Sequence, residues 1–289
     1  MNEMWKRWEG RTVDGRFPLQ SYLGGSDHSA VFLTTRQNGA GNSEKVAVKL
    51  IASSADSEKQ LQRWKPARDL NHPNLIRIFD AGRCKLDGTK LLYVVEEYAE
   101  ENLAQILPER ALTAEETRGM LPPILRALDF VHSKGLVHGH LQPSNVLAIG
   151  DQVKLSSDAL SASGETGGTP ASSAYAAPET ASGTISTAGD VWQVGITLIE
   201  VLTQRGPKPN GDWSKMPEIP ASIPEPFREI AGRCLQVEPG KRWTIGDILE
   251  RLGEKRPEAR RAHCDCRESA RAGPRRSDAK STPAPAACA

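Results

Sequence analysis

The order in which two residue patterns follow one another constrains the fold of this chain most. Up to residue 97 the chain has short apolar runs, separated by turns rich in Gly, Asn, Ser and Asp. Such runs predict β-strands. The predicted strands span residues 17–23, 30–35, 45–51, 75–80 and 91–97. From residue 98 onward the apolar residues keep helical spacing, which predicts α-helices. We therefore expect an α+β fold with a small β-rich lobe, a hinge at residues 97–101 and a larger helical lobe.

Helix signals refine this expectation. Thr113 with Glu116 three residues later forms a capping-box pattern, which predicts a helix start. A helix is also expected in the small lobe from about residue 56 to 70, although Pro66 should kink it or end it early. Further helical segments are predicted at residues 198–202, 227–235 and 245–252.

Composition excludes several classes of function. The net charge of +1 argues against a general nucleic-acid or membrane binder. No apolar run approaches the roughly 20 residues that span a bilayer, and the N-terminus lacks the apolar core of a signal peptide. We therefore expect a cytoplasmic protein. The 5 cysteines have no framework spacing, and residues 263–266 (HCDC) lack a second ligand pair, so neither disulfides nor a metal site is predicted.

The predicted domain boundaries follow the composition. Residues 1–16 form an N-terminal extension, 17–97 the small lobe, 98–253 the large lobe and 254–289 a disordered tail. The tail is rich in Ala, Arg, Pro and Ser and has no apolar periodicity, so it cannot bury enough apolar surface to fold. Its net charge of about +4 could contact an acidic partner, although a solvated tail is the simpler interpretation.

One short stretch carries a chemical motif. Residues 137–145 read V-H-G-H-L-Q-P-S-N. They resemble the catalytic loop of protein kinases, H-R-D-L-x-x-x-N, in which the Asp accepts the substrate hydroxyl proton and the Asn holds a magnesium ion. His138 and Asn145 match this motif, whereas His140 stands at the Asp position and Gly139 at the Arg position.

Other kinase motifs occur on either side, in the order of the family. Residues 23–31 resemble the glycine-rich loop, 46–49 (VAVK) the V-A-I-K strand, 177–179 an intact A-P-E, and 190–192 the start of the long helix F. Arg242 stands where the family's Arg pairs with the A-P-E Glu. Over roughly residues 17–253 the chain therefore resembles a bacterial-type Ser/Thr protein kinase domain, which implies a two-lobed kinase fold.

The resemblance also implies roles for individual residues. The nucleotide-binding positions are Leu23, Gly24, Val31, Ala47, Lys49, Glu96, Glu97 and Ala99. The catalytic positions are His140 and Asn145. The structural positions are His138, Glu179, Asp190 and Arg242, and Glu179 and Arg242 are expected to form a buried ion pair.

The positions that perform the chemistry depart from the family pattern. Ser26 and Ser29 replace two glycines of the phosphate loop, and Arg63 falls at or near the position of the helix C Glu. Ser157 aligns with the D-F-G Asp and cannot replace a carboxylate on Mg²⁺. Asp158 comes one residue later, which on an extended backbone should turn it to the opposite face. This argues against Mg²⁺ binding, and no metal ligand is assigned.

Two further positions leave alternatives open. His140 could act as a general base near neutral pH, but it lacks the negative charge that orients a hydroxyl beside a metal-bound phosphate. Glu96 stands where the family has an apolar residue at the back of the pocket. We expect Glu96 to pair with Lys49, because a buried carboxylate without a partner is costly. The alternative is that Glu96 turns outward on a shifted strand.

Two hypotheses for function follow. The first is a pseudokinase: a kinase-like signalling or scaffold module that binds a protein partner and, at most weakly, ATP. The second is an atypical active Ser/Thr protein kinase that transfers the ATP γ-phosphate to a protein hydroxyl. The identity of the partner or substrate does not follow from the sequence.

Overall fold

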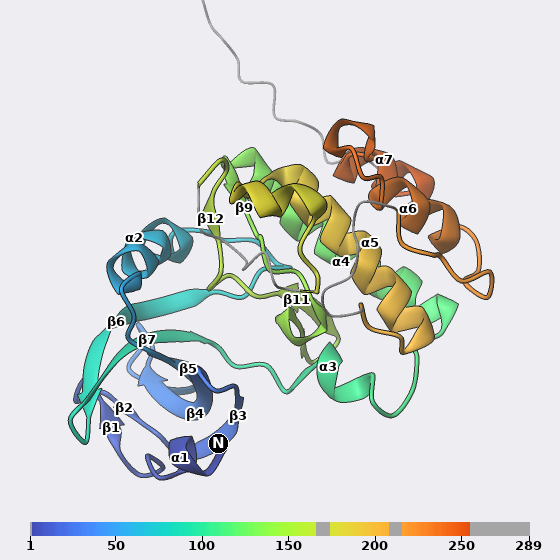
Figure 1. Ribbon diagram of the computed structural model, residues 1–289. Helices are drawn as coiled ribbons and strands as arrows, with labels where there is room; N and C mark the ends of the chain where they lie inside the picture. The colour runs from blue at the N-terminus through green and yellow to red at the C-terminus, as the bar shows by residue number, and fades with distance from the viewer. Residues whose placement is uncertain (1, 166–173, 208–215, 255–289) are drawn as a thin grey trace, which may run out of the picture. The chain divides into compact units, whose positions relative to one another are not determined.

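The computed structural model describes residues 2–165, 174–207 and 216–254, and it confirms the predicted α+β architecture (Figure 1). A sheet-based lobe precedes a helical lobe in the chain. The predicted tail at 254–289 lies, apart from its first residue, outside the described residues. In the described part of the chain, no helix has the length and apolar character needed to cross a bilayer.

The small lobe is built on a five-stranded antiparallel sheet with strand order β3-β4-β5-β7-β6. The elements of this lobe are α1 (Asn2–Lys6), β1 (Thr12–Val13), β2 (Phe17–Pro18), β3 (Ser21–Gly25), β4 (Ser29–Gln37), β5 (Ser43–Ala52), α2 (Ser57–Arg68), β6 (Ile78–Leu86) and β7 (Thr89–Glu97). The strand predicted at residues 75–80 begins later, because Asn74 O and Ile76 N bond instead with Leu155 of the large lobe, which makes Leu75 and Leu155 an isolated parallel bridge.

Helix α2 runs through Pro66 and ends at Arg68, two residues after the proline and two before the expected end near residue 70. Pro66 lies in the last turn, so the hydrogen bond that it cannot donate to the carbonyl four residues earlier is one of the last in the helix. Trp64 and Ala67 are buried and hold the inner face of α2 against the core.

The large lobe packs around helices α4 and α5, which contact each other (Figure 1). The elements of this lobe are β8 (Glu101–Asn102), α3 (Leu103–Ile106), α4 (Ala114–Ser133), β9 (Leu136–Val137), η1 (Pro143–Asn145), β10 (Val146–Ile149), β11 (Gln152–Leu155), β12 (Ser161–Ala162), η2 (Pro178–Ser182), α5 (Thr187–Thr203), α6 (Phe227–Cys234), η3 (Pro239–Lys241) and α7 (Ile245–Arg251).

The helix starts show why these elements form where they do. The capping box before α4 is confirmed: Glu116 N donates to Thr113 Oγ1 at 3.1 Å, and Thr113 N donates to Glu116 Oε2 at 2.8 Å. Helix α5 joins the segment predicted at 198–202 to residues 190–192, which the resemblance identified as the start of a long helix, and it begins three residues earlier, at Thr187.

The first residues of the chain are part of the small lobe. Trp5 and Trp8 are each 3% exposed and pack edge to face, with ring centroids 5.3 Å apart. They join Phe17, Phe32 and Tyr93 in one apolar cluster on the sheet. Burying a large apolar side chain contributes roughly 1.5–3 kcal/mol, so the residues predicted as an extension stabilise this lobe.

Candidate functional site

Strand register gathers the predicted nucleotide-binding residues on one face of the sheet. Gly24 pairs with Val31, Val31 with Lys49, and Ala47 with Glu96. Directly paired residues point to the same side of a sheet, and so do residues two apart in one strand. Gly24, Val31, Ala47, Lys49 and Glu96 therefore share a face of the sheet. Leu23, at the loop itself, is 39% exposed.

The loop between β3 and β4 is bonded to itself. Ser26 N donates to Ser29 O at 2.7 Å, the two hydroxyls lie 3.1 Å apart, and His28 N donates to Ser26 Oγ at 3.2 Å. A Cβ at Gly25 would lie 2.3 Å from Ser29 O, so only glycine fits there. The two serines that replace glycines, Ser26 and Ser29, therefore hold the turn closed by bonding with each other.

The Lys49 ammonium forms its ion pair with Asp158, and the expected pair with Glu96 is wrong. Lys49 Nζ lies 2.7 Å from Asp158 Oδ2, and the two side chains are 24% and 8% exposed. Glu96 lies close enough to act on the charge of Lys49, but its Oε2 atom is buried without a hydrogen-bond partner.

The side chains of Ser157 and Asp158 point the opposite way from the sequence prediction. Ser157 Oγ donates to Ile76 O at 2.6 Å in the interior. The two neighbouring side chains still point to opposite sides of the backbone. It is Ser157 that points into the interior, however, and Asp158 that points toward Lys49. The carbonyl of Asp158 accepts hydrogen bonds from Gln60 Nε2 at 3.0 Å and from Trp64 Nε1 at 2.8 Å, both on α2.

Electrostatics give this cluster one ion pair and one neutral acid at neutral pH. Burial lowers the pKa of Lys49, but the carboxylates of Asp158 and Glu96 outweigh burial and raise it overall. Burial raises the pKa of Asp158, and the charge of Lys49 more than reverses that effect. Burial, helped by the negative charge of Asp158, raises the pKa of Glu96 to about 8. Glu96 is therefore mainly protonated at pH 7.

We expect Glu96→Gln to change how stability depends on pH. The Glu96 carboxyl titrates near 4.5 in the unfolded chain and near 8 in the folded protein. The unfolded chain therefore loses its proton first, and the free energy of unfolding falls as pH rises between these values, by at most about 1.4 kcal/mol per pH unit. The Gln variant should lack this contribution and exceed the wild type in stability at pH 8, measured by urea unfolding from pH 5 to 9.

The variant Glu97→Gln is the control for that experiment, because it removes a neighbouring carboxylate on the same strand. It should keep the wild-type slope while losing some stability at every pH. If Glu96→Gln and the wild type show parallel stability curves over the whole range, the neutral Glu96 is excluded.

Helix α2 contacts the segment that follows Asp158 through Arg63, which the resemblance places at or near the family's helix C Glu. Arg63 Nη2 and Nε donate to Glu165 Oε1 at 2.7 and 3.1 Å, and the two side chains are 16% and 27% exposed. Helix α2 therefore holds the segment after Asp158 through the carboxylate of Glu165. Lys49, the lysine of the V-A-I-K motif, pairs with Asp158 instead of with a residue of α2.

The catalytic loop is held by Asp190, as the resemblance implied. Its carboxylate accepts hydrogen bonds from His138 N at 2.8 Å and Gly139 N at 2.6 Å. Gly139 has φ of 67°, a left-handed conformation that glycine adopts without strain. His138 is fully buried. His140 N donates to His138 Nδ1, so Nε2 must carry the proton that is donated to Ser156 O at 3.1 Å.

His140 lies in the same buried cluster as the ion pair. Burial lowers its pKa and Lys49 lowers it further, while Asp158 acts in the opposite direction, and the net shift is downward. A neutral imidazole can accept a proton. Asn145 Nδ2 donates to His140 O at 2.7 Å, so this amide fixes the loop.

The side chains at and beside the family's metal positions are bonded within the protein. Oxygen ligands with negative charge are what Mg²⁺ prefers. Ser157 is neutral and bonded to a carbonyl, and Asp158 is bound by Lys49. Across residues 2–165, 174–207 and 216–254, no group of three or more His, Cys, Asp or Glu side chains could hold a metal ion.

At the hinge, the Glu97 carboxylate is bound by Lys154, whose Nζ lies 2.7 and 2.8 Å from its two oxygens. This side chain therefore links β7 to β11. Ala99 follows β7 and is half-buried.

The expected structural pair is present in the large lobe. Arg242 Nη1 donates to Glu179 Oε1 at 2.6 Å and Nη2 to Oε2 at 2.8 Å. The side chain of Arg242 is only 1% exposed and that of Glu179 23%. Arg242 also donates to the carbonyls of Gln236 and Ala188, each at 2.8 Å.

Comparison of the sequence with known proteins identifies the family of this chain. A family model described as the protein kinase domain matches residues 18–252. This chain belongs to the protein kinase family. A probable serine/threonine-protein kinase of Streptomyces coelicolor is 30% identical over 216 residues, which are 69% of this chain and 32% of that protein. The serine/threonine-protein kinase PkaA of the same organism is 29% identical over 278 residues, 84% of this chain and 50% of that protein.

A megakaryocyte-associated tyrosine-protein kinase of Rattus norvegicus is 30% identical over 231 residues, 73% of this chain and 48% of that protein. The kinase domain thus spans between about a third and half of the length of these relatives.

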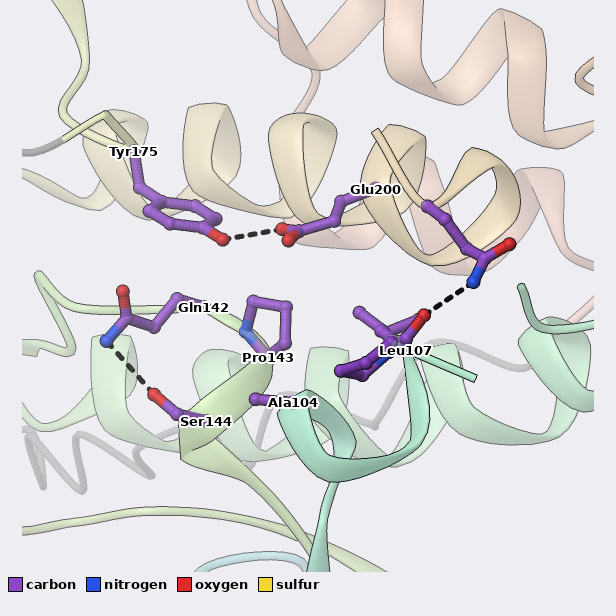
Figure 2. A pocket seen from close by; sticks show the side chains of 9 residues that line it. Ala104, Leu107, Gln142, Pro143, Ser144, Tyr175 and Glu200 are labelled. Atoms are coloured by element: carbon purple, nitrogen blue, oxygen red, sulfur yellow. Dashed lines mark hydrogen bonds between the residues drawn. The ribbon is translucent and has the colours of Figure 1, made fainter. Parts of the chain in front are cut away.

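A pocket in the kinase domain lies beside the catalytic loop. It has a volume of about 280 Å³ and is lined by α3, the end of α5 and residues 142–144. Figure 2 shows Tyr175 and Glu200 facing each other across one side, with Tyr175 Oη donating to Glu200 Oε2 at 2.5 Å. On another side, Gln142 Nε2 donates to Ser144 Oγ at 3.1 Å. Burial raises the pKa of Glu200, although the hydrogen bond from Tyr175 acts against it.

Sequence reasoning missed three residues that shape the kinase site. Alternation along the backbone wrongly turned Asp158 away from the site. Gln60 and Trp64 match no catalytic motif, because their role is to bind a backbone carbonyl. Their spacing of four residues, which places them on one face of a helix, was the only available indication.

Proposed function

We propose that this kinase domain is a pseudokinase: a signalling or scaffold module that binds a protein partner and holds ATP weakly and without Mg²⁺. The observation that carries the proposal is His140, an imidazole whose pKa is lowered by burial, at the position where the resemblance places the catalytic Asp. Lys49 also pairs with Asp158 at 2.7 Å, which engages one of the three N–H groups of Lys49 and one of the two oxygens of Asp158. Lys49 is the side chain that would contact phosphates, and Asp158 is the carboxylate nearest to the family's metal position.

Charge balance supports weak binding of a nucleotide. At pH 7 the cluster contains one positive and one negative charge, with Glu96 and His140 neutral. A triphosphate would share Lys49 with Asp158 or displace it, and a displaced Asp158 carboxylate would lose its buried partner. Removing the partner of a buried charge is strongly unfavourable. Kinase domains bind ATP in general. In this domain we expect weaker binding, because Asp158 already balances the positive charge of Lys49.

The alternative is an atypical active Ser/Thr kinase, which the names of the Streptomyces relatives favour. In that case His140 would accept the hydroxyl proton, because a neutral imidazole is a competent base. Phosphoryl transfer also needs the charge on the phosphates to be neutralised. Gln142 stands two residues after His140, at a position where the family has a lysine, and it supplies no charge.

Thermal unfolding with nucleotide tests the proposal. A ligand that binds only the folded state raises its stability in proportion to the logarithm of ligand concentration over Kd. We expect millimolar ATP to raise the midpoint slightly and equally with Mg²⁺ or with EDTA, and Lys49→Met to abolish the shift. A shift that requires Mg²⁺ would contradict the proposal, and so would a shift that indicates micromolar affinity.

A further inference from the structure

The tip of the glycine-rich loop is bonded to the first helix of the chain. Trp5 Nε1, on α1, donates a hydrogen bond to the carbonyl of Ser26 at 3.0 Å. Ser26 is the residue whose amide and hydroxyl also close the turn with Ser29. In Figure 1, α1 lies beside β3, the strand that leads into this loop.

Two more contacts join the same elements. Glu9 Oε1 accepts a hydrogen bond from Tyr22 N at 2.7 Å, and the Lys6 ammonium lies 5.7 Å from the centroid of the Tyr22 ring. Tyr22 belongs to β3, next to the register shift between Tyr22 and Gly24. The N-terminal residues therefore hold both the tip of the loop and the strand below it.

The anchor of this contact is rigid. Trp5 is 3% exposed, and its ring packs edge to face on Trp8, which is equally buried. Both rings belong to the apolar cluster that includes Phe32 and Val48 of the sheet. A buried indole leaves its N–H fixed in direction, so the Ser26 carbonyl has a partner that does not move with the loop.

We propose that Trp5 is a positioning residue for the nucleotide-binding loop. Its indole N–H holds the Ser26 carbonyl from the side of the N-terminal helix and keeps the turn at residues 26–29 in place over the sheet. The effect on ATP affinity rests on the proposed nucleotide binding. The effect on the order of the loop does not, because it can be measured in the protein without ligand. Ordering a loop on binding opposes affinity, and Trp5 removes part of that cost beforehand.

The test compares Trp5→Phe with Trp8→Phe. Each variant keeps an aromatic ring in the same cluster and removes one indole N–H. The Trp8 Nε1 atom is buried without a hydrogen-bond partner, so Trp8→Phe is a matched control for the loss of volume. Amide hydrogen exchange of peptides covering residues 20–33 is measured in the protein without ligand, and ATP affinity is measured by titration in EDTA.

We expect Trp5→Phe to speed exchange in residues 24–29 and to weaken ATP binding, each by about 2- to 10-fold, the factor that corresponds to the net contribution of one hydrogen bond. Strands β5 and β7 should exchange as in the wild type. Trp8→Phe should change neither quantity. The proposal is overturned if exchange in the loop is unchanged in Trp5→Phe, or if both variants accelerate it equally.

The two proposals fail in different ways. If the wild type binds no ATP while Trp5→Phe still accelerates exchange in the loop, then nucleotide binding is wrong and the anchor stands. If ATP binds equally to the wild type and Trp5→Phe, and exchange is also equal, then the anchor is wrong and nucleotide binding stands.

Discussion

Replacing Arg242 by Ala is expected to lower the free energy of unfolding by about 3–5 kcal/mol, the usual cost of removing one partner of a buried ion pair. The guanidinium is 1% exposed and binds both oxygens of Glu179. Its loss also leaves the carbonyls of Gln236 and Ala188 without this donor. Urea unfolding at pH 7 measures the effect.

Lys241→Ala serves as the control, because Lys241 and Glu238 pair on the surface with side chains 64% and 68% exposed. It should change stability by no more than about 0.5 kcal/mol. Arg242→Lys keeps the charge and loses the two-pronged contact, so it should fall between Arg242→Ala and the wild type and remains measurable if the Ala variant does not fold. Equal stability of all three variants would show that the large lobe does not depend on this pair.

The second large effect is expected at Lys49. Lys49→Met should destabilise the protein by about 3 kcal/mol, because it leaves the Asp158 carboxylate buried without its partner. Asp158→Asn should cost less. Without the negative charge of Asp158, Glu96 loses a repulsion that raises its pKa, and it can ionise and pair with Lys49 instead.

Urea unfolding of Lys49→Met, Asp158→Asn, Glu96→Gln and the double variant Asp158→Asn with Glu96→Gln tests whether Glu96 can replace Asp158 as the partner of Lys49. The combination should be less stable than the sum of the single changes, because Lys49 then has neither carboxylate, and neighbouring sites that share a partner are not additive. If Asp158→Asn is as damaging as Lys49→Met, Glu96 does not replace Asp158.

The sequence predicted the fold, because the fold depends on local patterns. Apolar runs between turns predicted β4, β5 and β7, whereas the register that pairs Val31 with Lys49 and Ala47 with Glu96 came from the structure. Arg242 and Glu179 were also predicted correctly from their spacing in the motif order.

The partner of Lys49 could not be predicted, because it depends on a contact between distant segments. The phase of the backbone at residues 157 and 158 is set by the hydrogen bond from Ser157 to the Ile76 carbonyl, and by Gln60 and Trp64 on α2. Alternation alone predicts that Ser157 and Asp158 point to opposite sides, but it does not say which of the two faces Lys49. The same limit hid Trp5, whose position depends on packing against strands that follow it in the chain.

The most direct test of the account is phosphoryl transfer by the purified protein. Incubation with γ-labelled ATP and Mg²⁺ or Mn²⁺, with and without a general protein substrate, is compared with the same experiment on Lys49→Met. We expect no labelled protein above the level of the variant, because the neutral His140 stands at the position of the catalytic Asp and Ser157 is bonded to the Ile76 carbonyl instead of offering a carboxylate to a metal ion. Metal-dependent labelling by the wild type that disappears in Lys49→Met would contradict the account and establish an atypical active kinase.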